Sequence, residues 1–104
     1  MSYSIIYNSD AILDLMYIKA YIKYYKQNPK LADAVEQSIK QAIKLLDFSP
    51  KQYAVIGKTK DNEEVRRMPV KKYNVYYSVD DQVNVVTIYN IVYSGVDINQ
   101  IAIN

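Results

Sequence analysis

The 104-residue chain contains no cysteine and no histidine, which excludes disulfide bonds, thiolate chemistry and imidazole acid–base catalysis. Half of its residues are apolar and 23% are charged, a balance that predicts one globular domain over residues 1–104 with a core of its own. The formal net charge of +2 is too small to indicate nucleic-acid binding by itself.

The beginning of the chain and its hydropathy bear on localisation. Met1 is followed by no charged leader, no apolar signal segment and no cleavage site. No stretch approaches the roughly 18 apolar residues that a membrane span requires. We therefore expect a cytoplasmic protein without a membrane segment.

The first quarter of the chain predicts a strand followed by a helix. Residues 3–7 (YSIIY) are β-branched and aromatic, as in a short strand. Asn8, Ser9 and Asp10 offer helix N-caps, and the helix is expected to end near Gln27. Its polar residues form one narrow stripe that we expect to face water, leaving a broad apolar face for the sheet and for a second contact. The stripe comprises Asp14, Lys19, Lys23 and Lys26.

A second helix is predicted from Pro29 to about Leu46. Asn28 followed by Pro29 favours an immediate restart, because proline suits the first helical turn. The apolar residues then follow the helical period, and Glu36 and Lys40 form a favourable i,i+4 pair. The short link predicts an antiparallel helical hairpin.

The remainder of the chain predicts strands. Residues 53–56 are a weak candidate, and stronger ones cover 64–70, 72–79 and 83–93. Pro69 indicates an edge or bulge position. Asp80 and Asp81 are interpreted as a solvated turn rather than a metal pair, and Asp97 as the cap of a last short helical turn. We expect no metal site and no cofactor.

These elements together predict a fold class. The order is β-α-α-β-β-β with a short final helix. It predicts an α+β domain in which an N-terminal strand and an antiparallel helical hairpin pack on a mostly antiparallel sheet of four to five strands.

Positive charge concentrates in one segment. Between residues 58 and 72 there are six basic and three acidic side chains, 6 − 3 = +3. Arg66, Arg67, Lys71 and Lys72 are candidates for contacting a nucleic acid or an acidic partner. For Arg66 the competing interpretation is an aliphatic stem packed on the rim of the core, and for the lysines protection of a strand edge. Tyrosines supply contact area with a polar tip, and the two tyrosine candidates are Tyr76 and Tyr93, whereas Tyr73 and Tyr77 are expected in the core.

The order and spacing of the motifs RRMPV, KYNVYYSVD and VTIYNIVY, with the hairpin and first strand before them, resemble the RelE/ParE superfamily across essentially the whole chain. These proteins are the toxins of bacterial type II toxin–antitoxin, or plasmid stabilisation, modules. The resemblance implies one of two actions, RelE-like cleavage of mRNA on the ribosome or ParE-like inhibition of DNA gyrase. It also implies a cognate acidic antitoxin that holds the toxin inactive. The expected assembly is a heterotetramer with the antitoxin or a homodimer.

The match is closer to ParE-like members. Where RNA-cleaving relatives place arginines, this chain has Asn74 and Asn90, and the basic pair near the end of such toxins becomes Gly95 and Val96. The resemblance therefore favours ParE-like growth inhibition. A RelE-like mRNA endoribonuclease and a degenerate homologue that only binds antitoxin remain as alternatives. Residues expected to contact the antitoxin are Tyr17, Tyr21, Tyr24 and Tyr25.

Overall fold

The computed structural model describes residues 2–96. The elements follow one another as β1 (Ser4–Tyr7), α1 (Ser9–Ala20), the π-helical turn η1 (Tyr21–Tyr25), α2 (Pro29–Lys44), the 3-10 turn η2 (Leu45–Asp47), β2 (Val55–Lys58), β3 (Glu64–Val70), β4 (Tyr73–Asp80) and β5 (Val85–Tyr93). The helical turn expected after Asp97 lies outside the described residues.

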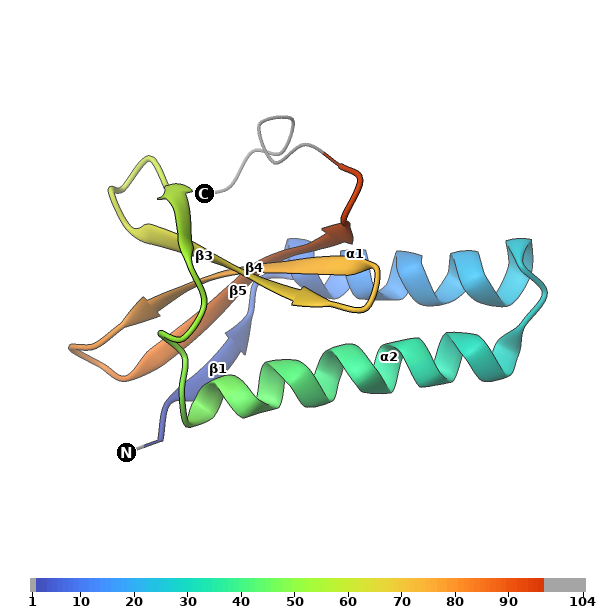
Figure 1. Ribbon diagram of the computed structural model, residues 1–104, viewed down its shortest axis with the longest axis horizontal. Helices are drawn as coiled ribbons and strands as arrows, with labels where there is room; N and C mark the ends of the chain where they lie inside the picture. The colour runs from blue at the N-terminus through green and yellow to red at the C-terminus, as the bar shows by residue number, and fades with distance from the viewer. Residues whose placement is uncertain (1, 97–104) are drawn as a thin grey trace.

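The five strands form one sheet in the order β1-β5-β4-β3-β2. β1 runs parallel to β5, and every other neighbouring pair is antiparallel. The helices α1 and α2 lie side by side as an antiparallel hairpin beside the sheet (Figure 1). The α+β class and the mostly antiparallel sheet are confirmed. The weak candidate strand near residue 55 is present as β2, so the sheet has five strands.

The main core lies between the helical hairpin and one face of the sheet. Leu15 and Ile18 of α1 and Ile39 and Ile43 of α2 belong to the same buried cluster as the sheet residues Met68, Val75, Tyr77, Val86, Ile88 and Ile91. Burying each large apolar side chain contributes about 1.5–3 kcal/mol. The helical and alternating apolar patterns therefore converge on one interface.

The connection between the helices follows the signals at Asn28 and Pro29. The first helix continues through η1 to Tyr25, and the chain then reverses at Gln27, whose φ is +50°. Asn28 caps α2, because its side-chain oxygen accepts a hydrogen bond of 3.0 Å from the backbone N–H of Leu31. The hairpin thus begins its second helix at Pro29, as predicted.

Ion pairs cross the hairpin on its exposed side. Lys19 Nζ of α1 lies 3.1 Å from a carboxylate oxygen of Glu36 on α2, and Lys40 lies 3.5 Å from the same carboxylate. The hydrogen bond from Lys19 lowers the pKa of Glu36. The predicted Glu36–Lys40 pair is present, and it is part of a contact between the two helices.

Pro69 occupies an edge position although β3 is an internal strand. β2 is short and pairs with β3 only between Glu64 and Arg66. Beyond that point Pro69 pairs with Asn74 of β4 on one side alone, so its missing N–H disrupts no ladder there. The edge assignment drawn from the proline is confirmed.

Lys71 and Lys72 form the turn between β3 and β4 rather than the start of a strand. Val70 pairs directly with Tyr73, and Lys71 has a φ of +57°. This left-handed backbone closes the hairpin and leaves both lysine side chains exposed. The expectation that Lys72 begins the strand is wrong by one residue, because the turn needs two.

Candidate partner-binding groove

A groove of about 810 Å³ lies between the helical hairpin, the β3–β4 turn and the end of β5. One side follows the helical spacing along α1 and η1, with Asp14, Tyr17 and Ile18 from α1 and Tyr21 and Ile22 from η1. Lys26 follows the hairpin's first helical stretch, α2 adds Leu31, Ala34, Val35 and Ser38, and the sheet side comprises Lys71, Lys72, Tyr73, Ile91, Val92, Tyr93 and Val96. The groove is therefore largely apolar, with lysines at its margin.

Three of the four tyrosines expected to meet a partner form one stacked row that begins in this groove. The ring centroids of Tyr17 and Tyr21 are 6.4 Å apart, and those of Tyr21 and Tyr25 are 5.2 Å apart, with the rings stacked. Tyr17 and Tyr25 are 70% and 82% exposed. Of the four tyrosines, only Tyr17 and Tyr21 line the groove itself. Tyr25 extends the stacked row beyond it, and Tyr24 is outside the row, with Lys23 Nζ 5.4 Å from its ring centroid.

The opposite wall carries a second aromatic pair. The rings of Tyr73 and Tyr93 meet edge to face with centroids 6.2 Å apart. Tyr93 is 55% exposed, while burial raises the pKa of Tyr73 above its ordinary value. Tyr73 thus anchors the wall and Tyr93 presents its ring to the solvent side.

A β-bulge explains why Tyr93 reaches this groove. β4 and β5 pair as Tyr76 with Asn90 and as Tyr77 with Ile88, so Tyr89 is an extra residue in β5. Simple alternation from Ile88 would place position 93 on the opposite face. The bulge shifts the alternation by one residue, and Tyr93 pairs with Tyr73 beside the groove.

Asp14 is part of the groove and not of the solvent-facing stripe predicted for it. Its Oδ2 accepts hydrogen bonds from the backbone N–H of Ile91 at 2.9 Å and from Asn90 Nδ2 at 3.2 Å. β1 ends at Tyr7, and Asn8 donates the last bond on this side to the Ile88 carbonyl. Asp14 therefore satisfies the next free donor of β5. The sequence does contain a sign of this position: Asp14 precedes Tyr17 by three residues and Ile18 by four, so it lies on the same helical face as these apolar residues.

The two arginine candidates lie away from the groove. Arg66 is partly buried, and its Nη1 donates to the carbonyl oxygens of Tyr53 at 2.7 Å and Lys51 at 3.0 Å. Arg67 is exposed and points to the other face of β3, because successive strand residues alternate. Of the six basic residues between 58 and 72, only Lys71 and Lys72 line the groove. The basic segment therefore does not converge on one surface, and Arg66 and Arg67 are separated from the lysine candidates.

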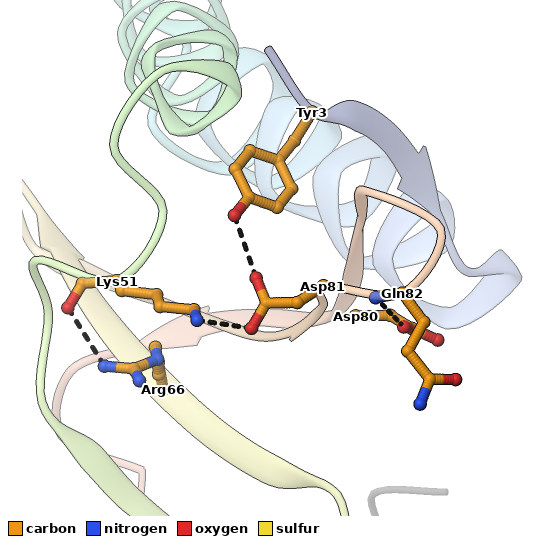
Figure 2. A network of polar contacts seen from close by, with 6 residues as sticks. All are labelled: Tyr3, Lys51, Arg66, Asp80, Asp81 and Gln82. Carbon is orange, nitrogen blue, oxygen red and sulfur yellow. Dashed lines mark hydrogen bonds and ion pairs between the residues drawn. The ribbon is translucent and has the colours of Figure 1, made fainter. Parts of the chain in front are cut away.

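Arg66 belongs to a polar network that joins three parts of the chain (Figure 2). Asp81, in the β4–β5 turn, accepts a hydrogen bond of 2.8 Å from Tyr3 Oη and forms an ion pair with Lys51. The hydrogen bonds from Lys51 and Tyr3 lower the pKa of Asp81. Asp80 instead accepts from the backbone N–H of Gln82. Asp81 thus lies in the turn, as predicted, whereas Asp80 is the last residue of β4. Residues 2–96 hold no acidic cluster suited to a metal ion.

Tyr76 is not available to a partner on this folded surface. Its side chain is 1% exposed, because β4 is central and Tyr76 lies between Arg67 of β3 and Asn90 of β5. Glu63 lies over the same face, where it accepts a hydrogen bond of 2.7 Å from Tyr89 Oη. The alternation of β4 placed Tyr76 on the face opposite Tyr77, but it did not indicate that this face is covered.

The asparagines and Arg66 are engaged by contacts within the protein. Asn74 and Asn90 occupy the two positions where the sequence comparison with RNA-cleaving toxins expects arginines. Their side chains are 9% and 8% exposed. Asn90 donates to Asp14, and the guanidinium of Arg66 is held by two carbonyls. What remains at the groove in the described part of the chain is apolar and aromatic surface with three lysines, Lys26, Lys71 and Lys72.

One family model matches nearly the whole chain. A family model described as the ParE toxin of the type II toxin–antitoxin system parDE matches residues 5–97. No curated protein matches the sequence. The chain of a chromosomal ParDE toxin–antitoxin system from P. aeruginosa is 21% identical with a TM-score of 0.65, over 88% of this chain and 96% of that one.

Two further solved structures share the fold. A chain of the archaeal RelE–RelB complex from Pyrococcus horikoshii is 19% identical with a TM-score of 0.64, over 93% of this chain and all (100%) of that one. A mutant of E. coli toxin RelE in the free state is 18% identical with a TM-score of 0.61, over 90% and 85% of the two chains. At such identities these likenesses establish the fold alone. Within residues 2–96, neither helix is long and apolar enough to cross a membrane.

Proposed function

The chain belongs to the ParE toxin family of type II toxin–antitoxin systems, and on that premise we propose that it inhibits growth by binding DNA gyrase and does not cleave RNA. A cognate antitoxin neutralises it by covering the groove. The two parts of the proposal rest on different observations. The first rests on the missing cationic contacts for RNA cleavage, and the second on the exposed apolar face of the hairpin.

The groove lining within residues 2–96 contains three lysines but no arginine, and this supports binding over RNA cleavage. A nuclease without histidine needs several cations around one phosphate, because charge develops on its oxygens in the transition state. Here Asn74 and Asn90 are buried amides, and Arg66 is engaged by the Lys51 and Tyr53 carbonyls. Each missing transition-state contact costs about 2.7–4 kcal/mol. Two or three such losses remove most of the rate enhancement. This observation carries the proposal of binding over RNA cleavage, and gyrase is the target that the ParE-like resemblance implies.

The exposed face of the hairpin supports an antitoxin partner. Leu13, Met16 and Tyr17 on α1 are 60%, 62% and 70% exposed, and they continue into the tyrosine row beside the groove. Contiguous apolar surface of this kind marks a site of protein association. An amphipathic segment that lies along the groove buries this surface and brings acids to Lys26, Lys71 and Lys72.

The test is controlled expression of the chain, alone and with the reading frame that adjoins its gene. We expect growth arrest when it is expressed alone and rescue when both are present. Primer extension should find intact mRNA, and purified protein should inhibit gyrase supercoiling.

Each contrary outcome selects a different function. Ribosome-dependent cuts in mRNA would establish the RelE-like nuclease and refute the gyrase proposal. Normal growth together with tight binding of the adjacent gene product would identify a homologue that only sequesters antitoxin. Normal growth with no such binding would contradict the toxin function itself.

A further inference from the structure

The groove contains one acidic side chain that the proposed function leaves unexplained. Its described charged residues are Lys26, Lys71 and Lys72 at the margin and Asp14 on α1. The lysines suit an acidic partner. Asp14 does not, because a carboxylate and an acidic segment repel each other.

The geometry of Asp14 is fixed by the sheet. Both hydrogen bonds that it accepts, from Ile91 N–H and from Asn90 Nδ2, end on the single oxygen Oδ2. The second oxygen, Oδ1, has no partner in the described part of the chain. It is not fully buried, since residues 2–96 contain no buried side-chain oxygen or nitrogen without a partner, and Asp14 as a whole is half-buried. One oxygen thus orients the carboxylate and the other is free.

The apolar surroundings of Oδ1 make its hydrogen bonding important for the affinity of a bound segment. Tyr17 and Ile18 lie three and four residues along the same helical face, and Ile91 lies across from them. A purely apolar segment that fills the groove strips water from Oδ1 and returns no hydrogen bond. Leaving a charged acceptor buried and unpaired is costly, whereas a donor on the partner restores the bond.

We infer that Asp14 is a specificity determinant of the groove: Oδ1 accepts a hydrogen bond from a cationic or amide donor on the bound segment, flanked by apolar side chains. The segment that fits carries acids opposite the marginal lysines and one donor, a lysine or arginine above all, opposite Asp14. This inference deepens the proposed function. It rests on one part of that function, namely that the groove is the docking site of a polypeptide. The donor excludes segments that are acidic and apolar throughout.

The experiment selects a random 16-residue peptide library displayed on phage against the purified full chain. A parallel selection uses Asp14→Asn, which keeps an oxygen for Ile91 N–H but presents an amide donor to the groove. Asp10→Asn is the matched control, because Asp10 is an exposed acid one turn earlier on α1. Thermal unfolding shows that each variant is folded. Tyr21→Asp identifies which peptides occupy the groove.

The peptides selected on each variant distinguish the role of Asp14. Peptides selected on the wild-type chain share a lysine or arginine at one position between apolar residues and lose binding to Tyr21→Asp. They bind Asp14→Asn about tenfold to hundredfold more weakly and bind Asp10→Asn unchanged. Selection on Asp14→Asn replaces the basic position with an acidic one.

Other results overturn it. The inference fails if the two selections give the same consensus, if wild-type peptides bind Asp14→Asn unchanged, if they tolerate Tyr21→Asp, or if no peptide is enriched. None of these outcomes depends on growth arrest, so failure of the toxin proposal in cells is recognised separately.

Discussion

A buried hydroxyl and an exposed carboxylate hold the loop after α2 in place. Tyr77 is fully buried, and its Oη donates a hydrogen bond of 2.5 Å to the carbonyl of Pro50. This bond ties the loop after α2 to the central strand β4. Asp81 ties the same loop, through Lys51, to the β4–β5 turn.

Tyr77→Phe tests the first of these contacts. The variant leaves the buried Pro50 carbonyl without its donor, and we expect it to lose about 1–3 kcal/mol of unfolding free energy in urea titrations at pH 7. Tyr25→Phe, at an 82% exposed ring, should stay within about 0.5 kcal/mol of the wild-type chain. Equal stabilities for the two variants would contradict a stabilising role for the Tyr77 hydroxyl.

The same residue predicts a response to alkali. Burial raises the pKa of Tyr77 from 10.0 to about 12. A raised folded-state pKa contributes stability that is complete below pH 10 and is lost as pH rises toward 12. Urea titrations of the wild-type chain should therefore show declining stability over this window, and Tyr77→Phe should decline less.

Asp81→Asn tests the second contact in the acid range. The pKa of Asp81 is lowered by its hydrogen bonds from Lys51 and Tyr3, so its contribution is present at neutral pH and lost as pH falls through that lowered value. We expect the variant to unfold at lower urea than the wild-type chain at pH 7, with the difference vanishing in strong acid. Glu64→Gln, which removes an exposed charge from β3, is the control. A difference that persists in acid would rule out the charge as its source.

At the scale of elements, the two helices begin with the same residue type in different roles. Asn28 accepts a capping hydrogen bond from Leu31 N–H, whereas Asn8 makes no side-chain bond to the backbone of α1. The sequence signals for both starts look alike. The structure distinguishes them, because only Asn28 satisfies a free donor of the first turn.

Asn28→Ala and Asn8→Ala therefore form a matched pair. The first should lower the unfolding free energy by about 0.5–2 kcal/mol, the usual value of an N-cap, and the second by less. Chemical denaturation of both variants, with far-ultraviolet circular dichroism of the folded state, provides the measurement. An equal loss of unfolding free energy in the two variants would mean that the hydrogen bond from Leu31 N–H to Asn28 adds no stability beyond the effect of replacing asparagine by alanine.

For the whole molecule, the distribution of charge matters more than its sum. Lys71 and Lys72 line the groove, whereas Lys58 and Lys60 lie at the end of β2 and in the loop after it. All four belong to the one basic segment of the sequence. Its two ends are brought to different surfaces by the β3 strand.

Charge reversal at both places tests the groove as the antitoxin site. The double variant Lys71→Glu/Lys72→Glu should weaken binding of the adjacent gene product about tenfold, because an acidic partner loses attraction and meets repulsion. The double variant Lys58→Glu/Lys60→Glu changes the net charge equally and should bind as the wild-type chain does. Calorimetric titration at two salt concentrations measures both. A common loss in the two variants would point to net charge and away from the groove.

The sequence alone predicted the fold class and most element boundaries, because those depend on local spacing. The period of α2, the alternation of β4 and the prolines at 29 and 69 act within a few residues of one another. The resemblance carried by the strand motifs indicated the toxin superfamily, and the family match confirms it. The gyrase target, the antitoxin and the oligomeric state stay predictions.

Only the tertiary structure decided which side chains share a surface. Asp14, Lys26, Lys71 and Tyr93 meet at one groove, although more than 70 positions separate the first from the last in the printed sequence. The bulge at Tyr89 and the two-residue turn at Lys71 set this arrangement. Burial of Tyr76 and capture of Arg66 by two carbonyls likewise arise from contacts between distant strands and loops. Local periodicity determines the elements, but strand order, register and turn geometry determine the site.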